Sequence, residues 1–85
     1  MAILVVEDEI RVRSFNERGL TEEGYVVRVA GDAAEADREL AAGGIEAVLL
    51  DWTLPGTPGI DLLAAWRARE DVTPVVMITA RDAVD

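Results

Sequence analysis

The sequence predicts an α/β fold in which one parallel sheet carries helices on both faces, and 85 residues allow one small domain. Two observations predict this class. Short runs rich in Val, Ile, Leu and Met alternate with longer polar stretches, as buried parallel strands and their connecting helices do. The polar stretches also contain helix start and stop signals. Alternating strands and helices imply parallel strands joined by right-handed crossovers.

Four apolar runs are the predicted strands. Three of them are almost continuous in aliphatic residues, which indicates that helices cover both of their faces. The remaining run contains Arg28, and a charged residue inside a strand is typical of an edge. In chain order the runs are residues 3–6, 25–29, 47–50 and 75–78.

The first predicted helix covers about residues 9–23 and ends at Gly24. Its apolar positions place Val12, Phe15 and Leu20 toward the core. The second helix begins at Asp32, where Glu35 three residues later completes a capping-box pattern.

Glycines at positions 43 and 44 end this second helix. A third helix covers about residues 61–70, with Leu62, Leu63 and Trp66 spaced for one buried face. Pro74 ends that connection before the last strand, so the order is strand–helix three times and then a fourth strand.

Polar side chains with useful chemistry follow three of the strands. Glu7 and Asp8 follow the first strand, Asp51 the third and Thr79 the fourth. Ligands of such sheets bind outside the carboxyl ends of the strands. Three carboxylates in a small space raise one another's pKa unless a cation joins them. The chain has no Cys and no His, so a hard ion held by oxygen, such as Mg²⁺, is the metal that fits.

Structural explanations of the same residues stay open at this point. Acidic residues favour the first turn of a helix, so Glu7 and Asp8 could serve only that purpose. An Asp after a strand is often a turn former, and Thr79 could be a helix cap. Because these residues stand at corresponding ends of separate strands, a shared binding site is the favoured interpretation.

Composition limits the partners. Seventeen acidic residues against eight basic ones give a formal charge of -9, and all eight basic residues are Arg. An acidic surface repels nucleic acid and anionic lipid, so we expect no direct contact with either. The apolar start is too short for a signal peptide or a membrane span, which predicts a cytoplasmic protein.

Three segments resemble the receiver domains of bacterial two-component response regulators. They are residues 3–9 (ILVVEDE), residues 49–56 (LLDWTLPG) with Gly59, and residues 74–80 (PVVMITA). The resemblance covers the whole chain in order and with normal spacing. It implies a flavodoxin-like, doubly wound parallel sheet with the strand order 2-1-3-4-5.

The resemblance also implies roles for particular residues. Asp51 would accept a phosphoryl group from a sensor histidine kinase. Asp8 would bind Mg²⁺ directly, Glu7 would bind it through water, and the backbone carbonyl of Thr53 would be a further ligand.

Two residues near the end of the chain would contact the phosphoryl group. The hydroxyl of Thr79 would bond a phosphoryl oxygen and move as the switch, and the backbone N–H of Ala80 would hold another oxygen. Such a domain assists its own phosphorylation and dephosphorylation and is not otherwise an enzyme. Residues 79–82 (TARD) resemble receivers that precede a winged-helix DNA-binding domain, which implies a DNA-binding output domain in the full-length protein.

By this resemblance residues 1–85 are the N-terminal two-thirds of a receiver, from the first strand to the start of the fourth helix. Family members continue through a fifth strand, which carries a lysine that pairs with the phosphoryl group, and a fifth helix. The chain contains no lysine. We therefore expect slow or absent phosphoryl uptake by these residues alone, and self-association through the edge of the fourth strand or an uncovered face of the sheet.

Three other functions are alternatives to a phosphate-accepting receiver. A receiver-fold interaction module without phosphotransfer is the main alternative, and Mg²⁺ binding with phosphoryl uptake would separate the two. A Mg²⁺-dependent phosphatase would need a second Asp where Thr53 stands. A dinucleotide enzyme would need a glycine-rich turn after the first strand, and none is present.

Overall fold

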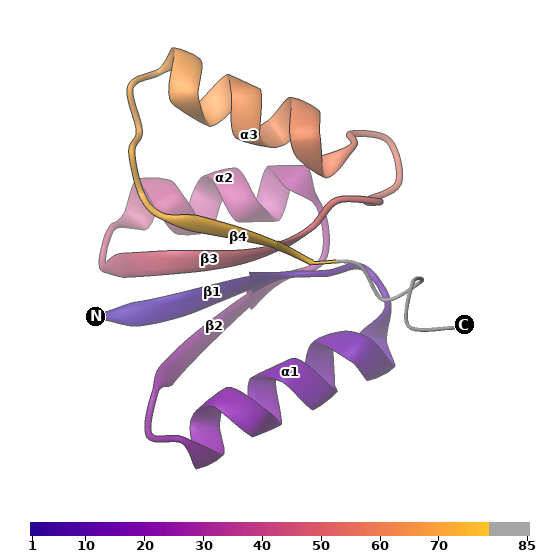
Figure 1. The fold of residues 1–85 in the computed structure, drawn as a ribbon, viewed down its shortest axis with the longest axis vertical. Coiled ribbons are helices and arrows are strands. Elements are labelled where there is room, and N and C mark those ends of the chain that lie inside the picture. Colours follow the sequence, from indigo (N-terminus) through magenta and orange to yellow (C-terminus); the bar gives the residue numbers. More distant parts are fainter. Residues whose placement is uncertain (79–85) are drawn as a thin grey trace.

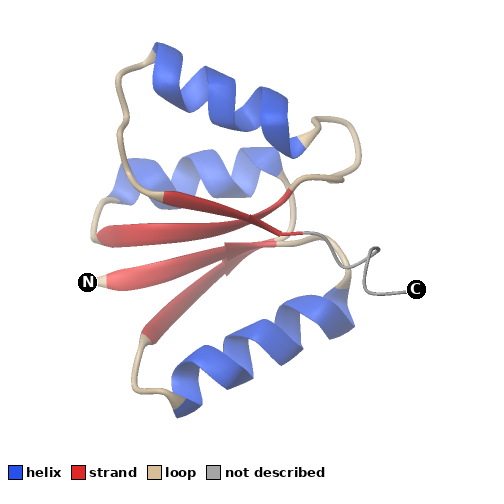
Figure 2. Cartoon of the chain, in the orientation of Figure 1, coloured by secondary structure: helices blue, strands red, loops and turns tan. Residues whose placement is uncertain are grey.

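A computed structural model of the chain describes residues 1–78, which form strands and helices in alternation (Figure 1). Each predicted element is present, with bounds within two residues of the prediction, so the α/β prediction is confirmed (Figure 2). In order the elements are β1 (Ala2–Val6), α1 (Ile10–Glu22), β2 (Val26–Ala30), α2 (Ala33–Ala42), β3 (Ile45–Asp51), α3 (Gly59–Ala68) and β4 (Val75–Ile78).

The four strands make one parallel sheet with the order β2-β1-β3-β4. These are the first four strands of the order 2-1-3-4-5 that the resemblance implies. β1 lies inside the sheet and all five of its residues are buried. β2 lies at an edge, as Arg28 indicated, and Arg28 links β2 to α2 through an ion pair of 2.7 Å with Glu39.

Helices cover the two faces of the sheet unequally. α2 and α3 lie on one face, and α1 lies on the other (Figure 1). The main core forms under α2 and α3, where Leu4, Val48 and Leu50 pack with Leu62 and Trp66. Trp66 is buried as predicted, and its indole N–H donates to Asp37 of α2 over 2.8 Å.

The prediction for α1 was wrong at one position. Val12 and Leu20 are half-buried, but the side chain of Phe15 is 70% exposed. At 100° per residue, Val12 and Leu20 lie on one strip of the helix that also includes Asn16, and Phe15 lies outside that strip, beyond the edge marked by Val12. Three apolar residues on a helix fit more than one choice of inner face, and the packing of α1 on the sheet decides between them.

No helix within residues 1–78 combines the length and the apolar character that crossing a bilayer requires. The predictions for Thr79 and Ala80 lie outside the described residues.

Candidate functional site

The pairing of β1 with β3 brings the predicted acidic residues together. Val6 of β1 pairs with Leu50 of β3, so the next residues, Glu7 and Asp51, lie level at the carboxyl edge of the sheet. Glu7 is 1% exposed and Asp51 2% exposed, whereas Asp8 is exposed to solvent. One carboxylate oxygen from each of the three lies within 4.8 Å of the others. This spacing suits three ligands of a single cation.

Glu7 is buried without full hydrogen bonding. Its Oε2 accepts the backbone N–H of Glu9 over 3.0 Å, but its Oε1 accepts no hydrogen bond from the described residues. Burial raises the pKa of Glu7 from 4.5 to about 7, and the negative charges of Asp51 and Asp8 add to this rise against the opposing N–H of Glu9. A buried carboxylate oxygen without a partner is costly, and a bound cation would remove that cost.

The sequence predicted repulsion among the carboxylates as the reason for a raised pKa. The structure makes burial the larger cause at Glu7. The donor set is made of carboxylates at a partly open edge, which fits a hard cation such as Mg²⁺.

The Asp51 carboxylate is oriented by the turn that follows β3. Its Oδ1 accepts the backbone N–H and the side-chain hydroxyl of Thr53, each over 3.0 Å. Both bonds reach the same oxygen, and Thr53 leaves Oδ2 without a bond from this turn. The second oxygen therefore remains available for chemistry.

A second turn shows that the hydroxyl contact is a local feature. In the loop before β4, Oδ1 of Asp71 accepts the N–H of Thr73 over 3.0 Å and its hydroxyl over 2.6 Å, and these bonds lower the pKa of Asp71. That loop lies at the opposite edge of the sheet. An Asp followed two residues later by Thr forms the same turn at both places, so the hydroxyl of Thr53 orients Asp51 without itself indicating a site.

Gly59 holds the loop of residues 52–58 against the site. A Cβ on Gly59 would lie 2.5 Å from Cα of Trp52 and 2.6 Å from the carbonyl oxygen of Asp51, and the Gly59 N–H donates to the Trp52 carbonyl over 2.9 Å. The first residue of α3 thus packs directly on the backbone that carries Asp51. Trp52 itself, a loop aromatic next to the site, is 52% exposed.

One residue near the site was missed by the sequence analysis. Nη1 of Arg13, on α1, donates to the backbone carbonyl of Glu7 over 3.1 Å. The only signal in the sequence is a basic residue about one helical turn after the acidic run, which is too common a pattern to indicate a role.

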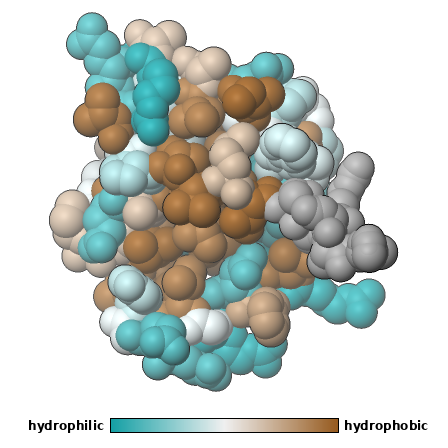
Figure 3. Space-filling model, in the orientation of Figure 1, coloured by the Kyte–Doolittle hydropathy of each residue, from teal (hydrophilic) through white to brown (hydrophobic). Residues whose placement is uncertain are grey.

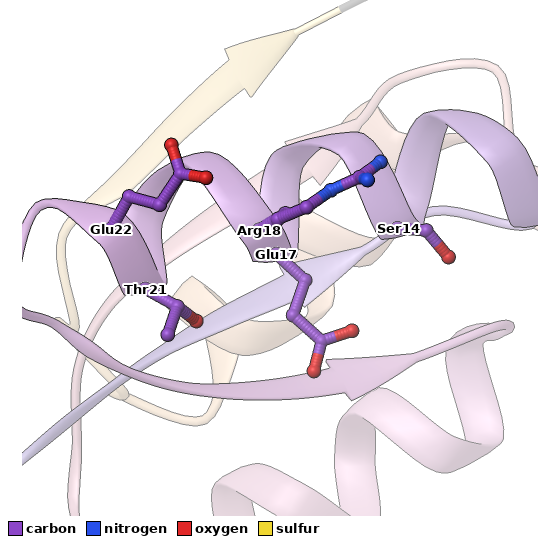
Figure 4. A pocket seen from close by; sticks show the side chains of 5 residues that line it. All are labelled: Ser14, Glu17, Arg18, Thr21 and Glu22. Carbon is purple, nitrogen blue, oxygen red and sulfur yellow. The ribbon is translucent and has the colours of Figure 1, made fainter.

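A shallow hollow on α1 has no comparable chemistry. Its lining side chains come from a single helix and spread apart instead of pointing toward one another (Figure 4). They are Ser14, Glu17, Arg18, Thr21 and Glu22. Of the features considered, the carboxylate edge is therefore the candidate site.

Comparison with known proteins identifies the family of the chain. The profile of the response regulator receiver domain family matches residues 3–85. The transcriptional regulatory protein TcrA of Mycobacterium tuberculosis is 44% identical over 82 residues, which are 96% of this chain and 32% of TcrA. The swarming motility regulation protein RssB of Serratia marcescens is 36% identical over 85 residues, which are all of this chain and 39% of RssB. The chain thus spans about a third of the length of these relatives.

Solved structures resemble the fold closely. The receiver domain of Francisella response regulator 1452 superposes with a TM-score of 0.88 at 29% identity, covering 98% of this chain and 69% of that domain. The response regulator TrrA from Thermotoga maritima, solved in complex with Mg²⁺-BeF, gives a TM-score of 0.87 at 31% identity and covers 98% of this chain and 73% of TrrA. With the family profile matching nearly every residue, the chain belongs to the response regulator receiver domain family.

Proposed function

We propose that Asp51 accepts a phosphoryl group from a sensor histidine kinase in a reaction that uses Mg²⁺, and that this modification switches an output domain. The observation that carries the proposal is the convergence of Glu7, Asp8 and Asp51 within 4.8 Å at the carboxyl edge of the sheet, with one oxygen of the buried Glu7 left without a hydrogen bond.

The residues present fit a bound Mg²⁺. Asp8 and Asp51 would hold the ion directly, Glu7 through water, and the backbone carbonyl of Thr53 would complete the protein ligands. When bound, the ion would offset two of the three negative charges of the carboxylates, so that an anionic phosphoryl group can approach.

The chemical step is a transfer to a carboxylate oxygen. An oxygen of Asp51 forms a bond to phosphorus while the P–N bond of a phosphohistidine breaks, and the released imidazole nitrogen keeps the electron pair and takes up a proton. The two hydrogen bonds from Thr53 to Oδ1 keep the carboxylate in one orientation. We assign the next contacts to the hydroxyl of Thr79 and the N–H of Ala80, which would bind phosphoryl oxygens.

The rest of the signalling chain is proposed from the relatives. TcrA is a transcriptional regulatory protein of which the matched segment is 32%, and this supports an output domain that binds DNA. We take residues 1–85 as the N-terminal two-thirds of the receiver, which the 69% and 73% coverage of the receiver structures supports.

A Mg²⁺ titration followed by tryptophan fluorescence tests the metal site. Trp52 is half-exposed and next to Asp51, so its emission should change as Mg²⁺ binds. Asp8→Ala and Asp51→Asn should weaken or abolish the response, while Asp61→Asn, an exposed carboxylate on α3, should leave it unchanged. The interaction module without phosphotransfer has no need of the ion. If wild type and both site variants titrate alike, Mg²⁺ does not bind at these carboxylates and the proposal is wrong.

A further inference from the structure

Arg13 touches the acidic site through the backbone. Its guanidinium donates from Nη1 to the carbonyl oxygen of Glu7 over 3.1 Å. That carbonyl belongs to the peptide bond between Glu7 and Asp8. The following peptide bond, between Asp8 and Glu9, is held as well, because its N–H donates to Oε2 of Glu7 over 3.0 Å.

Asp8 is therefore fixed by groups other than its own side chain. The two peptide planes on either side of it are each held by a side chain, one by Arg13 and one by Glu7. Asp8 is exposed, and its carboxylate forms no hydrogen bond within residues 1–78. The backbone at this turn thus determines where the Asp8 carboxylate lies relative to Asp51.

The end of β2 leaves room for this arginine. A Cβ on Gly31 would lie 2.7 Å from Nη1 of Arg13, closer than a carbon and a nitrogen can approach. The backbone N–H of Gly31 donates to Oε1 of Glu35 over 2.6 Å, and Glu35 is the third residue after the helix cap Asp32. The expected capping box is thus altered, since Glu35 reaches one residue further back than the cap and holds Gly31 beside Arg13.

We propose that Arg13 is a positioning residue for the metal site and that Gly31 is required for its placement. Arg13 holds the Glu7 carbonyl, which sets the turn so that the Asp8 carboxylate lies within reach of an ion shared with Asp51. The inference rests on the proposed function, because it assigns Arg13 a task for the same Mg²⁺ site.

Two substitutions disturb this contact by different routes. Arg13→Ala removes the donor. Gly31→Ala keeps the donor but places a methyl group where Nη1 lies, and the flexible end of the arginine side chain can move away without displacing backbone. Gly19→Ala is the matched control, because a Cβ there would have no atom within 4 Å.

The test measures the Mg²⁺ dissociation constant by Trp52 fluorescence in the protein at its natural length, well below each variant's melting temperature. Residues that orient metal ligands typically change affinity by tenfold or more, so Arg13→Ala and Gly31→Ala should each weaken binding about tenfold. The double variant should be no weaker than either single one, because both remove the same contact. Gly19→Ala should match wild type.

The outcomes separate this inference from the proposed function. If wild type shows no Mg²⁺ response, the proposed function is wrong and the role of Arg13 is lost with it. If wild type responds but folded Arg13→Ala and Gly31→Ala bind Mg²⁺ as tightly, Arg13 has no positioning role. A double variant whose losses add would show that Gly31 acts independently of Arg13, which also overturns the proposal.

Discussion

Glu7 is almost completely buried, yet one of its oxygens accepts no hydrogen bond from the described residues. Burial is the main cause that raises its pKa to about 7, and the charges of Asp51 and Asp8 contribute further. The side chain is therefore partly protonated near neutral pH in the metal-free protein. Binding a cation favours the charged form, so metal binding and proton loss at Glu7 are coupled.

The stability of the metal-free protein should fall as pH rises from about 4.5 to about 7. Folding raises the pKa of Glu7 across this interval, so the folded state holds the proton more tightly than the unfolded chain does, and raising the pH favours unfolding. At 1.36 kcal/mol per pKa unit the loss reaches about 3 kcal/mol. Urea unfolding at several pH values measures it.

Glu7→Gln should remove most of this pH dependence, because the amide cannot titrate, and the variant should be more stable than wild type at pH 8 without metal. Glu46→Gln, an exposed carboxylate on β3, should behave as wild type does. A Glu7→Gln protein whose stability still falls over the same interval would show that Glu7 is not the responsible group.

At this scale the sequence indicated which residues meet but not how they are held. The pattern of acidic residues after strands was enough to predict that Glu7, Asp8 and Asp51 converge. The burial of Glu7 and the contact from Arg13 depend on how α1 packs against the ends of β1 and β2. No local pattern contains that information.

The junction between β3 and α3 is the element on which the position of Asp51 depends. The loop of residues 52–58 returns so closely that only a residue without a side chain fits at position 59, where Trp52 Cα and the Asp51 carbonyl would lie 2.5 and 2.6 Å from a Cβ. The sequence placed Gly59 with residues 49–56 in one of the segments that resemble the family. The close contact of Gly59 with the backbone of Asp51 and Trp52 depends on the path of the loop, which the sequence pattern does not specify.

Gly59→Ala should destabilise the protein, because the contacts are with backbone that cannot move aside cheaply. Forcing a methyl group into a packed position costs about 1–3 kcal/mol. Gly19→Ala makes the same chemical change inside exposed α1 and should stabilise by about 0.5–1 kcal/mol, since alanine favours helix. Urea unfolding compares the two. Equal stability of Gly59→Ala and wild type would contradict the close packing.

Element identities followed from the sequence more reliably than their orientation did. Nearly continuous aliphatic runs marked the strands, and the cap at Asp32 was correct to the residue, with its Oδ1 accepting the N–H of Glu35 over 2.8 Å. The inner face of α1 was wrong at Phe15 because the three apolar residues used to predict it fit more than one face. Tertiary packing makes that choice.

At the scale of the whole molecule, two helices cover one face of the sheet and a single helix covers the other (Figure 1). Figure 3 shows apolar side chains gathered over the middle of the view, in the region where β4 passes between α3 and α1 in Figure 1. Large apolar residues exposed in the described part include Phe15 at 70%, Val26 at 64% and Val76 at 56%. β4 is at an edge of the sheet formed by residues 1–78.

A polypeptide of residues 1–85 alone should therefore self-associate or fold only partly. Each aliphatic side chain left exposed forgoes about 1.5–3 kcal/mol, against a domain stability of about 5–15 kcal/mol. An edge strand with apolar neighbours is also a template for pairing with another chain. Sedimentation at several concentrations measures this. Val76→Lys should reduce the association, and a compact wild-type monomer that melts cooperatively at every concentration would contradict the prediction.

Whether Asp51 carries the phosphoryl group is tested most directly by locating that group in the chain. The protein, at its natural length, is incubated with a small phosphodonor and Mg²⁺, trapped by borohydride reduction of the acyl phosphate, and mapped by peptide mass spectrometry. We predict modification at Asp51 alone, lost in Asp51→Asn and when Mg²⁺ is chelated. Modification at Asp8, at exposed carboxylates or at no residue would contradict the assignment of Asp51 as the acceptor.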